Sequence, residues 1–337
     1  MIALPLMIPV SESSQVGEAR RAANRVAEAA KFSVSECGEV SIIASELATN
    51  LHRYGRNGRM IIQPVAQTSG TVVEMVAVDS GPGMEDISRC MRDGYSRGGT
   101  AGNGLGSVRR LSTEFDIYSI PGKGTIVFSR VGPRQRGSAP PAGRFQWATV
   151  AAAAPHETLC GDAWRIHERE EELSILIADG LGHGPAASQA AECAAGLFES
   201  NPFIDPAAFM ATAHRGLSGT RGAAGGAGHL SASAKILRYA GVGNIAGWIL
   251  SADGSRGLFT HNGTLGMQAP TFKQMEYAWP DRGLLIMHSD GLQSRWSFEN
   301  YPGLLFRHPA VIANVLYRDF VRGRDDVTVA VIRINAP

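Results

Sequence analysis

Residues 173–184 read LSILIADGLGHG, an apolar run that ends at Asp179 and enters a glycine-rich turn. Residues 284–291 have the same pattern, LLIMHSDG, with Asp290 in the equivalent place. A short apolar run bounded by glycine is typical of a buried strand, which here carries a carboxylate at its end. Two strands of this kind can bring their carboxylates to one site, so we expect a domain built around strands.

Two further aspartates lie in similar contexts. Asp162 follows Gly161, and Asp325 is followed by a second aspartate, Asp326. Carboxylate oxygens are the ligands that Mg²⁺ and Mn²⁺ prefer. Two such ions about 3.5–4 Å apart can hold a hydroxide for in-line attack on a phosphate group. The aspartates therefore predict metal-assisted hydrolysis of a phosphate ester.

These motifs resemble the SpoIIE-like branch of the PPM metal-dependent protein phosphatases, over about residues 145–334. The matching stretches are GDAW, ADGLGHGPAAS, HSDGLQSRW and RDDVTVAVIRI. The resemblance implies a phosphoserine or phosphothreonine phosphatase with two Mn²⁺ or Mg²⁺ ions. It implies that the metal site consists of Asp162, Asp179, Gly180 through its carbonyl, Asp290 and Asp325. Asp179 and Asp290 would carry catalysis, and Asp326 would have a supporting role.

His183 lies four residues after Asp179, in GHGPAA. An imidazole titrates near neutral pH and could protonate a leaving alkoxide. Its position at the start of an expected helix equally suits a capping or turn role, and the residues leave both readings open.

Three short motifs occur in order in the first part of the chain. Glu46 and Asn50 in SELATN share one face of an expected helix, where a carboxylate can accept a proton and an amide oxygen can bind Mg²⁺. Asp79 ends an apolar run in DSGPG and could accept a hydrogen bond from an adenine amino group. The third motif, GNGLG at residues 102–106, precedes a helix whose amides could hold phosphates. Taken singly, each motif equally fits a solvated helix face or a tight turn.

The combination resembles the GHKL ATPase superfamily, and within it the RsbT-type switch kinases and anti-sigma kinases. The resemblance covers most of residues 13–130 and includes SELATNLHRYGRNGRM and GNGLGSVRRLSTEFDIYS. It implies ATP with Mg²⁺ as cofactor, Glu46 as catalytic carboxylate, Asn50 as Mg²⁺ ligand and Asp79 as adenine contact. It also places Gly81, Gly83, Gly102, Gly104 and Gly106 around the nucleotide, with Thr125 completing the adenine pocket.

The order of the elements predicts an α+β protein with two domains. Helical periodicity at Val16–Ala30 and Val40–Leu51 precedes strand-like runs, which favours a GHKL (Bergerat) α/β sandwich over residues 1–131. Residues 132–144 are rich in proline and glycine and are expected to form a linker. Residues 145–337 are expected to form a PPM-type β-sandwich flanked by α-helices (αββα). Within it, the Gly/Ala-rich segment Gly216–Gly228 is expected to be a flexible loop.

Composition excludes several functional classes. With 44% hydrophobic residues, 19% charged residues and a formal net charge of +1, the chain has no broad basic footprint for nucleic acid. The four cysteines are dispersed without a CxxC pair, so neither a zinc site nor a disulfide framework is expected. The apolar stretch Met1–Val10 is far too short to span a bilayer, and we expect a cytoplasmic protein with no membrane partner.

Both halves together predict a bifunctional partner-switching regulator. Its kinase-like domain would phosphorylate a STAS-domain antagonist protein, and its phosphatase domain would remove phosphate from the phosphorylated form. A sigma factor or another switch protein is a further expected partner. In the alternative, only the phosphatase is an enzyme, and the N-terminal domain is a nucleotide-dependent binding module for a STAS protein or a sigma factor.

Overall fold

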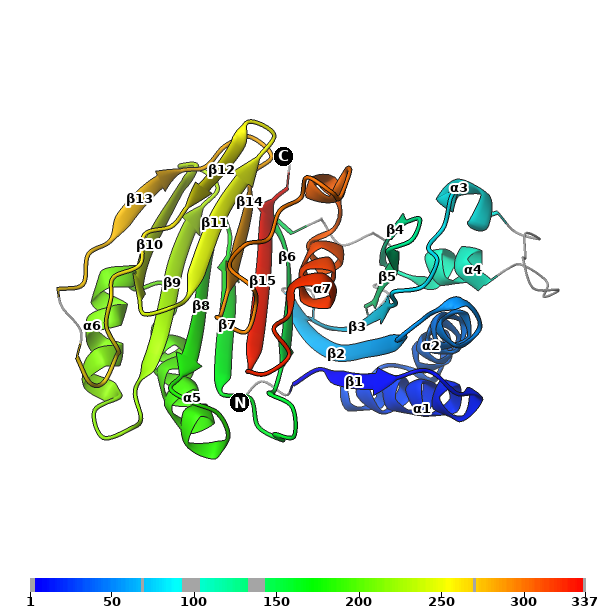
Figure 1. Ribbon diagram of the computed structural model, residues 1–337, viewed down its shortest axis with the longest axis horizontal. Coiled ribbons are helices and arrows are strands. Elements are labelled where there is room, and N and C mark those ends of the chain that lie inside the picture. The colour runs from blue at the N-terminus through cyan, green and yellow to red at the C-terminus, as the bar shows by residue number, and fades with distance from the viewer. Residues whose placement is uncertain (1–3, 68–69, 93–103, 133–142, 269–270, 336–337) are drawn as a thin grey trace. The chain divides into compact units, whose positions relative to one another are not determined.

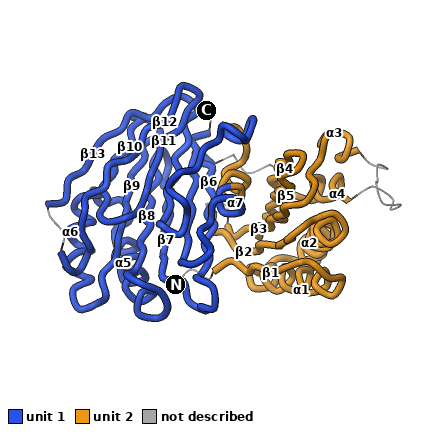
Figure 2. Tube along the Cα trace, in the orientation of Figure 1, with its two compact units in different colours: residues 1–2, 142–305, 316–337 blue, residues 3–141, 306–315 orange. Residues whose placement is uncertain are grey.

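The computed structural model describes residues 4–67, 70–92, 104–132, 143–268 and 271–335. Gly102 and most of the expected linker 132–144 lie outside the described residues. The chain divides into two compact units (Figure 2). The N-terminal unit consists of Ala3–Pro141 together with Phe306–Val315, and the C-terminal unit consists mainly of Ala142–Leu305 and Leu316–Pro337.

The N-terminal unit contains one antiparallel sheet with the strand order β1-β2-β3-β5-β4 (Figure 1). The strands are β1 (Leu6–Pro9), β2 (Arg59–Gln67), β3 (Gly70–Val78), β4 (Glu114–Ile120) and β5 (Gly124–Val131). The helices that belong wholly to this unit are α1 (Ser13–Ala29), α2 (Val34–Tyr54), α3 (Ile87–Cys90) and α4 (Gly104–Leu111). Helices α1 and α2 were expected from the sequence, and both are confirmed.

Helix α2 shows why these residues form the core of the N-terminal unit. Ser33 and Glu36 form a capping box, in which the Ser33 Oγ accepts from the Glu36 backbone N and the Glu36 carboxylate accepts from the Ser33 N (2.8 Å). The fully buried stripe follows helical spacing through Val40, Ile43 and Leu47. This face packs against small α1 residues and the sheet, so α2 is fixed along its whole length.

Strand β5 buries both of its faces. Val127 and Val131 belong to the core beneath the helices, whereas Phe128 and Arg130 point to the opposite face and are also buried. On that face the Phe128 ring stacks on His308, with 3.9 Å between ring centroids. The segment Phe306–Val315, distant in sequence, therefore covers part of the second face of the sheet within the N-terminal unit.

The C-terminal unit contains two five-stranded antiparallel sheets, with strand orders β13-β10-β9-β8-β7 and β12-β11-β14-β15-β6. The first sheet is formed by β7 (Asp162–Arg169), β8 (Glu172–Gly180), β9 (Ala223–Ser231), β10 (Ile236–Val242) and β13 (Met275–Ala278). The second is formed by β6 (Phe145–Ala152), β11 (Ala246–Ser251), β12 (Gly254–Gly257), β14 (Leu284–His288) and β15 (Val327–Ile334).

One apolar core joins the two sheets of this unit, with residues such as Ile175 and Tyr239 from one sheet and Leu285 and Ile332 from the other. A second core lies between the first sheet and the helices α5 (Pro185–Ser200) and α6 (Pro206–Gly216). The expected β-sandwich flanked by helices is thereby confirmed.

The prediction of a flexible loop at Gly216–Gly228 is wrong for its second half. Residues 223–231 form β9, a central strand between β8 and β10. The small residues are required by close packing, because a Cβ atom on Gly226 would lie 2.7 Å from the Tyr239 hydroxyl oxygen. A Cβ atom on Gly225 would lie 2.8 Å from a Leu265 methyl carbon. Glycine in this strand therefore reflects the close approach of neighbouring side chains, not a flexible backbone.

The sequence also did not predict β1, β7, β12, β13, α3 or helix α7 (Pro309–Phe320), which follows a short 3₁₀ turn (Leu304–Phe306). Helix α7 is buried on all sides from Ala310 to Tyr317. Residues 310–317 read AVIANVLY, and a short run that is almost continuously apolar is hard to tell from a buried strand. Among the helices of the described residues, none is long and apolar enough to cross a membrane.

Candidate functional site

Glu46 and Asn50 both lie on α2, and both are half-buried. Helix α4 begins directly over Glu46, because a Cβ atom on Gly104 would lie 2.6 Å from the Glu46 Oε2. A side chain at position 104 would therefore displace the Glu46 carboxylate. The structure therefore brings together Glu46 and the described part of the GNGLG motif, in which Gly104 and Gly106 form the first turn of α4.

Asp79 follows the last residue of β3 and is held by its backbone. Its N–H donates to the Thr125 carbonyl (3.0 Å), and its Oδ1 accepts from the Gly81 N–H (2.6 Å). Gly124 has φ +86°, and a Cβ atom there would lie 2.0 Å from the Asp79 carbonyl oxygen. The β4–β5 hairpin and the Asp79 turn thus approach as closely as two backbones can.

The rest of this turn is fastened to the same hairpin. Gly83 has φ +71°, and a Cβ atom there would lie 2.3 Å from the Ile120 carbonyl oxygen. The Ser119 hydroxyl accepts from the Met84 N–H (2.8 Å) and hydrogen-bonds to the Thr125 hydroxyl (2.8 Å). The structure therefore brings the turn of Asp79, Gly81 and Gly83 against Thr125 of β5.

The aspartates of the C-terminal unit meet where β7, β8 and β14 and the segment before β15 converge. Asp162 and Asp179 are directly opposite one another in the β7–β8 ladder. The Asp162 Oδ2 accepts from the Ser289 hydroxyl (2.6 Å), and the Asp290 Oδ2 accepts from the Asn244 side-chain amide (2.8 Å). Ser289 and Asn244 are polar neighbours that sequence reasoning missed.

Glycines allow the loops of this cluster to touch. A Cβ atom on Gly291 would lie 1.9 Å from the Asp326 carbonyl oxygen, and one on Gly180 would lie 2.0 Å from the Ala187 carbonyl oxygen. Gly180 also donates its N–H to the Gly161 carbonyl (3.0 Å). The loops that carry the four predicted metal-ligand aspartates are thereby packed backbone to backbone.

The electrostatics of this cluster favour bound cations. Burial, followed by the charge of Asp179, raises the pKa of Asp162 well above its ordinary value. Burial, followed by the charges of Asp290 and Asp325, raises the pKa of Asp179 to about 7. Carboxylates packed this way repel one another until an opposite charge compensates them.

Two buried oxygens of the cluster, the Asp162 Oδ1 and the Asp326 Oδ2, have no hydrogen-bond donor among the residues that the structure describes. An unsatisfied buried carboxylate oxygen is costly unless a donor or a cation is bound to it. Within the described part of the chain, no three Asp, Glu, His or Cys side chains already form a closed cage around one ion. The buried carboxylates nevertheless are the kind of donor that divalent cations prefer.

Asp325 and Asp326 differ in their surroundings. The Asp325 Oδ1 accepts from the Asp326 N–H (3.0 Å), and the Asp326 Oδ1 accepts from the Ala154 N–H (2.9 Å). Asp326 is therefore tied to the end of β6, in keeping with the supporting role expected for it.

His183 is exposed, and its Nδ1 lies 2.7 Å from the Glu157 Oε1. This pair holds the glycine turn before α5, where Gly184 has φ +76° and lies against the Glu157 carboxylate. The arrangement favours the turn role over the catalytic one among the two readings left open by the sequence.

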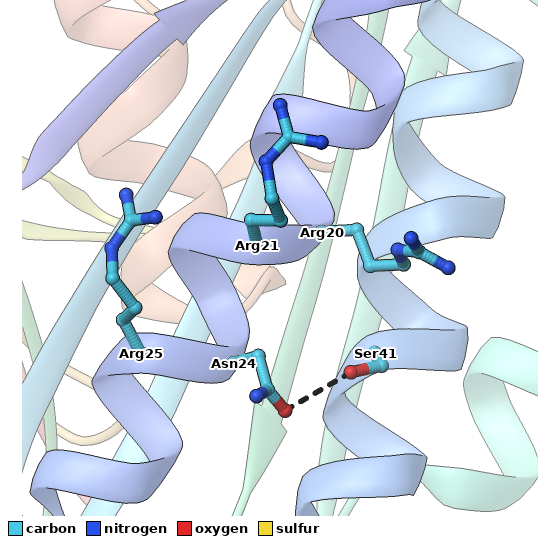
Figure 3. Close-up of a pocket in the computed structure, with 5 residues that line it drawn as sticks. All are labelled: Arg20, Arg21, Asn24, Arg25 and Ser41. Carbon is cyan, nitrogen blue, oxygen red and sulfur yellow. Dashed lines mark hydrogen bonds between the residues drawn. The ribbon is translucent and has the colours of Figure 1, made fainter.

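A second polar feature of the N-terminal unit is a groove of about 390 Å³ lined by Arg20, Arg21, Asn24 and Arg25 of α1 and Ser41 of α2 (Figure 3). The Ser41 hydroxyl donates to the Asn24 Oδ1 (3.2 Å), which links the two helices. The three arginines are exposed, and none has an ion-pair partner among the described residues. The groove, named here the arginine groove, therefore attracts acidic groups.

Comparison with known proteins identifies both halves. The family described as histidine kinase-like ATPase domain matches residues 10–130, and the family described as stage II sporulation protein E matches residues 169–335. The serine/threonine-protein kinase RsbT of Bacillus subtilis (strain 168) is 36% identical over 109 residues, which cover 32% of this chain and 82% of that protein. The phosphoserine phosphatase RsbX of the same strain is 23% identical over 138 residues, which cover 40% of this chain and 69% of that protein.

A solved structure described as "The bacterial stressosome: a modular system that has been adapted to control secondary messenger signaling" has a chain that is 29% identical to this one. Its TM-score is 0.52, and the match covers 56% of this chain and 99% of that chain. The chain therefore belongs to the family of the histidine kinase-like ATPase domains of the RsbT type, to which a SpoIIE-type phosphatase domain is fused in the same polypeptide.

Proposed function

We propose that this protein is a bifunctional partner-switching regulator. Its N-terminal unit uses Mg-ATP to phosphorylate a serine or threonine of a STAS-domain antagonist protein, and its C-terminal unit hydrolyses the phosphoserine or phosphothreonine of that protein. The observation that carries the proposal is the buried aspartate cluster, whose mutual repulsion and unsatisfied oxygens call for cations suited to phosphate chemistry.

In the N-terminal unit, each residue has a distinct task. Asp79, whose Oδ1 accepts from the Gly81 N–H, contacts an adenine amino group, and the first turn of α4 contacts phosphates. Glu46, half-buried beneath α4, accepts the proton of the attacking hydroxyl, and Asn50 holds Mg²⁺ one helical turn away. Gly102 completes the loop around the nucleotide in the part of the chain outside the described residues.

In the C-terminal unit, Asp162, Asp179, Asp290, Asp325 and the Gly180 carbonyl hold two Mn²⁺ or Mg²⁺ ions. The ions neutralise phosphate oxygens and supply a hydroxide nucleophile when bound. Ser289 orients Asp162, and Asn244 orients Asp290, by the hydrogen bonds described above. Asp326 fixes the loop that carries Asp325 by accepting from the Ala154 N–H.

The arginine groove is the proposed docking surface for the protein substrate. It lies on α1 and α2, and α2 also carries Glu46, about one and a half helical turns beyond Ser41. Three arginines without ion-pair partners in the described structure suit an acidic surface of the antagonist protein. This surface would hold the antagonist protein against the N-terminal unit.

The two activities are tested on the full chain with purified STAS-domain proteins from the same organism. Asp179→Asn should abolish metal-dependent release of phosphate from the phosphorylated STAS protein while leaving its phosphorylation intact. Glu46→Gln should abolish phosphorylation while leaving phosphate release intact, and nucleotide binding should persist in this variant. Arg238→Gln, which breaks an exposed pair with Glu276 on β10 and β13, is the matched control and should keep both activities.

Each half of the proposal can fail separately. Undiminished phosphate release in both Asp179→Asn and Asp290→Asn would refute the metal assignment. If Glu46→Gln and Asp79→Asn leave phosphorylation unchanged, the kinase assignment is wrong. A chain that binds the STAS protein in a nucleotide-dependent way but never phosphorylates it would instead have an N-terminal unit that is a binding module.

A further inference from the structure

In the C-terminal unit, an arginine lies close to the end of the strand that carries Asp179. Asp179 lies opposite Ala224 in the β8–β9 ladder. Two residues further on, the Leu181 N–H donates to the Gly222 carbonyl (3.1 Å). Arg221 precedes Gly222 and is therefore three residues from Ala224. Since a strand advances about 3.3 Å a residue, the Arg221 backbone lies about 10 Å along the chain from the residue opposite Asp179.

The Arg221 side chain is exposed, and its charge is not compensated. A Cβ atom on Gly182 would lie 3.0 Å from the Arg221 Nη1, so the guanidinium lies over the turn that follows Asp179. Gly182 has φ +84°, a left-handed conformation that favours glycine and leaves this space to the guanidinium. Among the residues that the structure describes, the guanidinium has neither an ion pair nor a hydrogen bond. Its charge is therefore available to an acidic group of a bound molecule.

Two exposed apolar residues flank Gly222. Leu181 is 40% exposed, and Met267, between β12 and β13, is 64% exposed. A Cβ atom on Gly222 would lie 3.2 Å from the Met267 Cγ, and the Gly222 carbonyl accepts from the Leu181 N–H. Leu181, Arg221 and Met267 therefore adjoin one another around Gly222, although they come from three separate loops. We name these three residues the loop patch.

The turn that carries Met267 is held by hydrogen bonds to its neighbours. The Leu265 backbone exchanges two hydrogen bonds with that of Ala223 on β9 (3.1 and 2.8 Å). The Gly266 N–H donates to the His214 Nδ1 of α6 (3.2 Å). Met267 is thus presented to solvent by a fixed backbone. Single exposed apolar residues are ordinary, but two of them beside an uncompensated arginine are typical of an interaction surface.

The chemistry of the loop patch suits a peptide segment better than other acidic ligands. A guanidinium can bind one carboxylate through two parallel N–H···O bonds. Binding to a nucleic-acid backbone requires a row of cations, whereas Arg221 is the one cation of the patch. Apolar neighbours shield an ion pair from water, and this strengthens the attraction. The patch therefore fits a segment that combines acidic and apolar side chains.

We propose that the loop patch binds the segment of the substrate protein next to its phosphorylated residue and so determines which segments are preferred. Arg221 pairs with an acidic side chain of that segment, and Leu181 and Met267 contact apolar side chains. The proposal rests on the proposed phosphatase activity of the aspartate cluster. An extended chain advances about 3.3–3.6 Å a residue, so a side chain two or three residues from the phosphorylated one reaches Arg221.

The experiment measures substrate preference in the full chain with defined peptides. Two phosphoserine peptides of equal length carry leucine next to the phosphoserine and differ only two and three residues away from it. At those positions one peptide has aspartate, and the other has lysine. Phosphate release is measured with Mn²⁺, and the ratio of kcat/KM for the acidic over the basic peptide is the charge preference. In the wild-type chain this preference should be about 5-fold or more.

Substitutions of Arg221 test the charge. Arg221→Gln should bring the charge preference close to one, and Arg221→Glu should reverse it, because the new carboxylate attracts lysine. Arg221→Lys keeps the charge and should keep most of the preference. Arg238→Gln, at another exposed arginine of the same unit, is the matched control and should keep the wild-type value. A merely structural effect lowers both rates together and leaves their ratio unchanged.

Met267→Ser tests the apolar part of the loop patch. A third peptide has the acidic residues but serine in place of leucine next to the phosphoserine. The wild-type chain should prefer the leucine peptide by about 3-fold, and Met267→Ser should lose this preference while keeping the charge preference. Met275→Ser, at a methionine of β13 that is 42% exposed, is the matched control and should keep both preferences.

Several results would overturn the proposal while the phosphatase activity stands. Equal kcat/KM for the acidic and basic peptides in the wild-type chain is one, and an unchanged charge preference in both Arg221→Gln and Arg221→Glu is another. An equal loss of preference in Arg238→Gln would likewise count against Arg221. Failure of the proposed function looks different, because the wild-type chain would then release no phosphate from any peptide or from p-nitrophenyl phosphate with Mn²⁺, and the loop patch would have no substrate to select.

Discussion

In the N-terminal unit, the Asp79 turn is held by backbone hydrogen bonds and by glycines that allow two backbones to touch. In the C-terminal unit, the loops of the aspartate cluster are equally close, but their carboxylates repel one another and two oxygens lack a donor. Contacts within the chain are enough to order the Asp79 turn. The aspartate cluster has an equally well packed backbone, but its negative charges need a bound cation to compensate them. The difference shows that a site can have an ordered backbone while its side-chain charges and hydrogen bonds remain uncompensated.

The backbone contacts of the two sites can be broken one at a time. Gly124→Ala and Gly291→Ala would each place a Cβ atom within 2.0 Å of a carbonyl oxygen, and each should lower the free energy of unfolding by about 3 kcal/mol or more. In chemical denaturation, Gly124→Ala should weaken the N-terminal unit and nucleotide binding. Gly291→Ala should weaken the C-terminal unit and Mn²⁺ binding.

Gly122→Ala is the control for this pair. Gly122 lies in the same hairpin with φ +80°, but a Cβ atom there would meet nothing within 4 Å in the described part of the chain. The substitution should cost only the left-handed backbone strain, about 1 kcal/mol. Equal stability of the Gly122→Ala and Gly124→Ala chains would show that the close approach of Gly124 to Asp79 does not contribute to the free energy of unfolding.

Cations should sharpen the contrast between the sites. Mn²⁺ at about 100 times its dissociation constant should stabilise the C-terminal unit by about 2.7 kcal/mol, measured as a rise in melting temperature. Asp179→Asn should raise the melting temperature of the metal-free chain, because it removes one of the repelling charges, and should abolish the response to Mn²⁺. Asp79→Asn should leave that response unchanged. A metal-free Asp179→Asn chain less stable than wild type would contradict the repulsion.

Ser289→Ala tests whether a single hydrogen bond orients a metal ligand. Ser289 donates to Asp162 and accepts from the Thr328 N–H (2.9 Å), so its loss frees a buried carboxylate and a buried amide. Mn²⁺ affinity measured by calorimetry should fall about 10- to 100-fold. Ser188→Ala, at another buried serine of the same unit, serves as the control and should bind Mn²⁺ as wild type does. An unchanged affinity in Ser289→Ala would mean that Asp162 needs no such support.

The smallest expected effect is on how stability depends on pH at low pH, through the contact of His308 with Glu114, which also pairs with Arg130. Burial lowers the pKa of His308 below 6.5. Burial alone would raise the pKa of Glu114, but the hydrogen bond from His308 and the charge of Arg130 outweigh it and lower that pKa from 4.5 to about 2. Both groups bind fewer protons when folded, so their contribution is complete above pH 6.5. It falls as the pH drops, first through His308 and then between about 4.5 and 2 through Glu114.

Glu114→Gln isolates this contribution from that of the aspartate cluster. The difference in melting temperature between wild type and variant should shrink as the pH falls from 5 toward 3, corresponding to about 1 kcal/mol after screening of the partly exposed carboxylate. A difference that stays constant over this range would show that Glu114 is not held in its charged form by the fold.

Sequence reasoning correctly predicted the elements that have a clear apolar periodicity or that end at a clear turn signal. Helix α2 was readable from its apolar spacing, and β8 and β14 from apolar runs that end at Asp179 and Asp290. It failed at β9, where glycine and alanine suggested a loop. The strand needs glycine there because Tyr239 and Leu265, on other segments, leave no room for a Cβ atom. It also missed Ser289 and Asn244, since their roles depend on partners 127 and 46 residues away.

The sequence by itself determined the two kinds of domain, the candidate residues for a nucleotide site and a metal site, and the order in which they occur. Local spacing suffices for these, because helices and strand ends are short-range properties of the chain. Only the tertiary structure decided that β9 is a central strand, that the aspartate cluster leaves two oxygens unsatisfied, and that His308 is held by β4 and β5. These features arise from packing between segments far apart in sequence, and such packing leaves no periodic signal in the residues that take part in it.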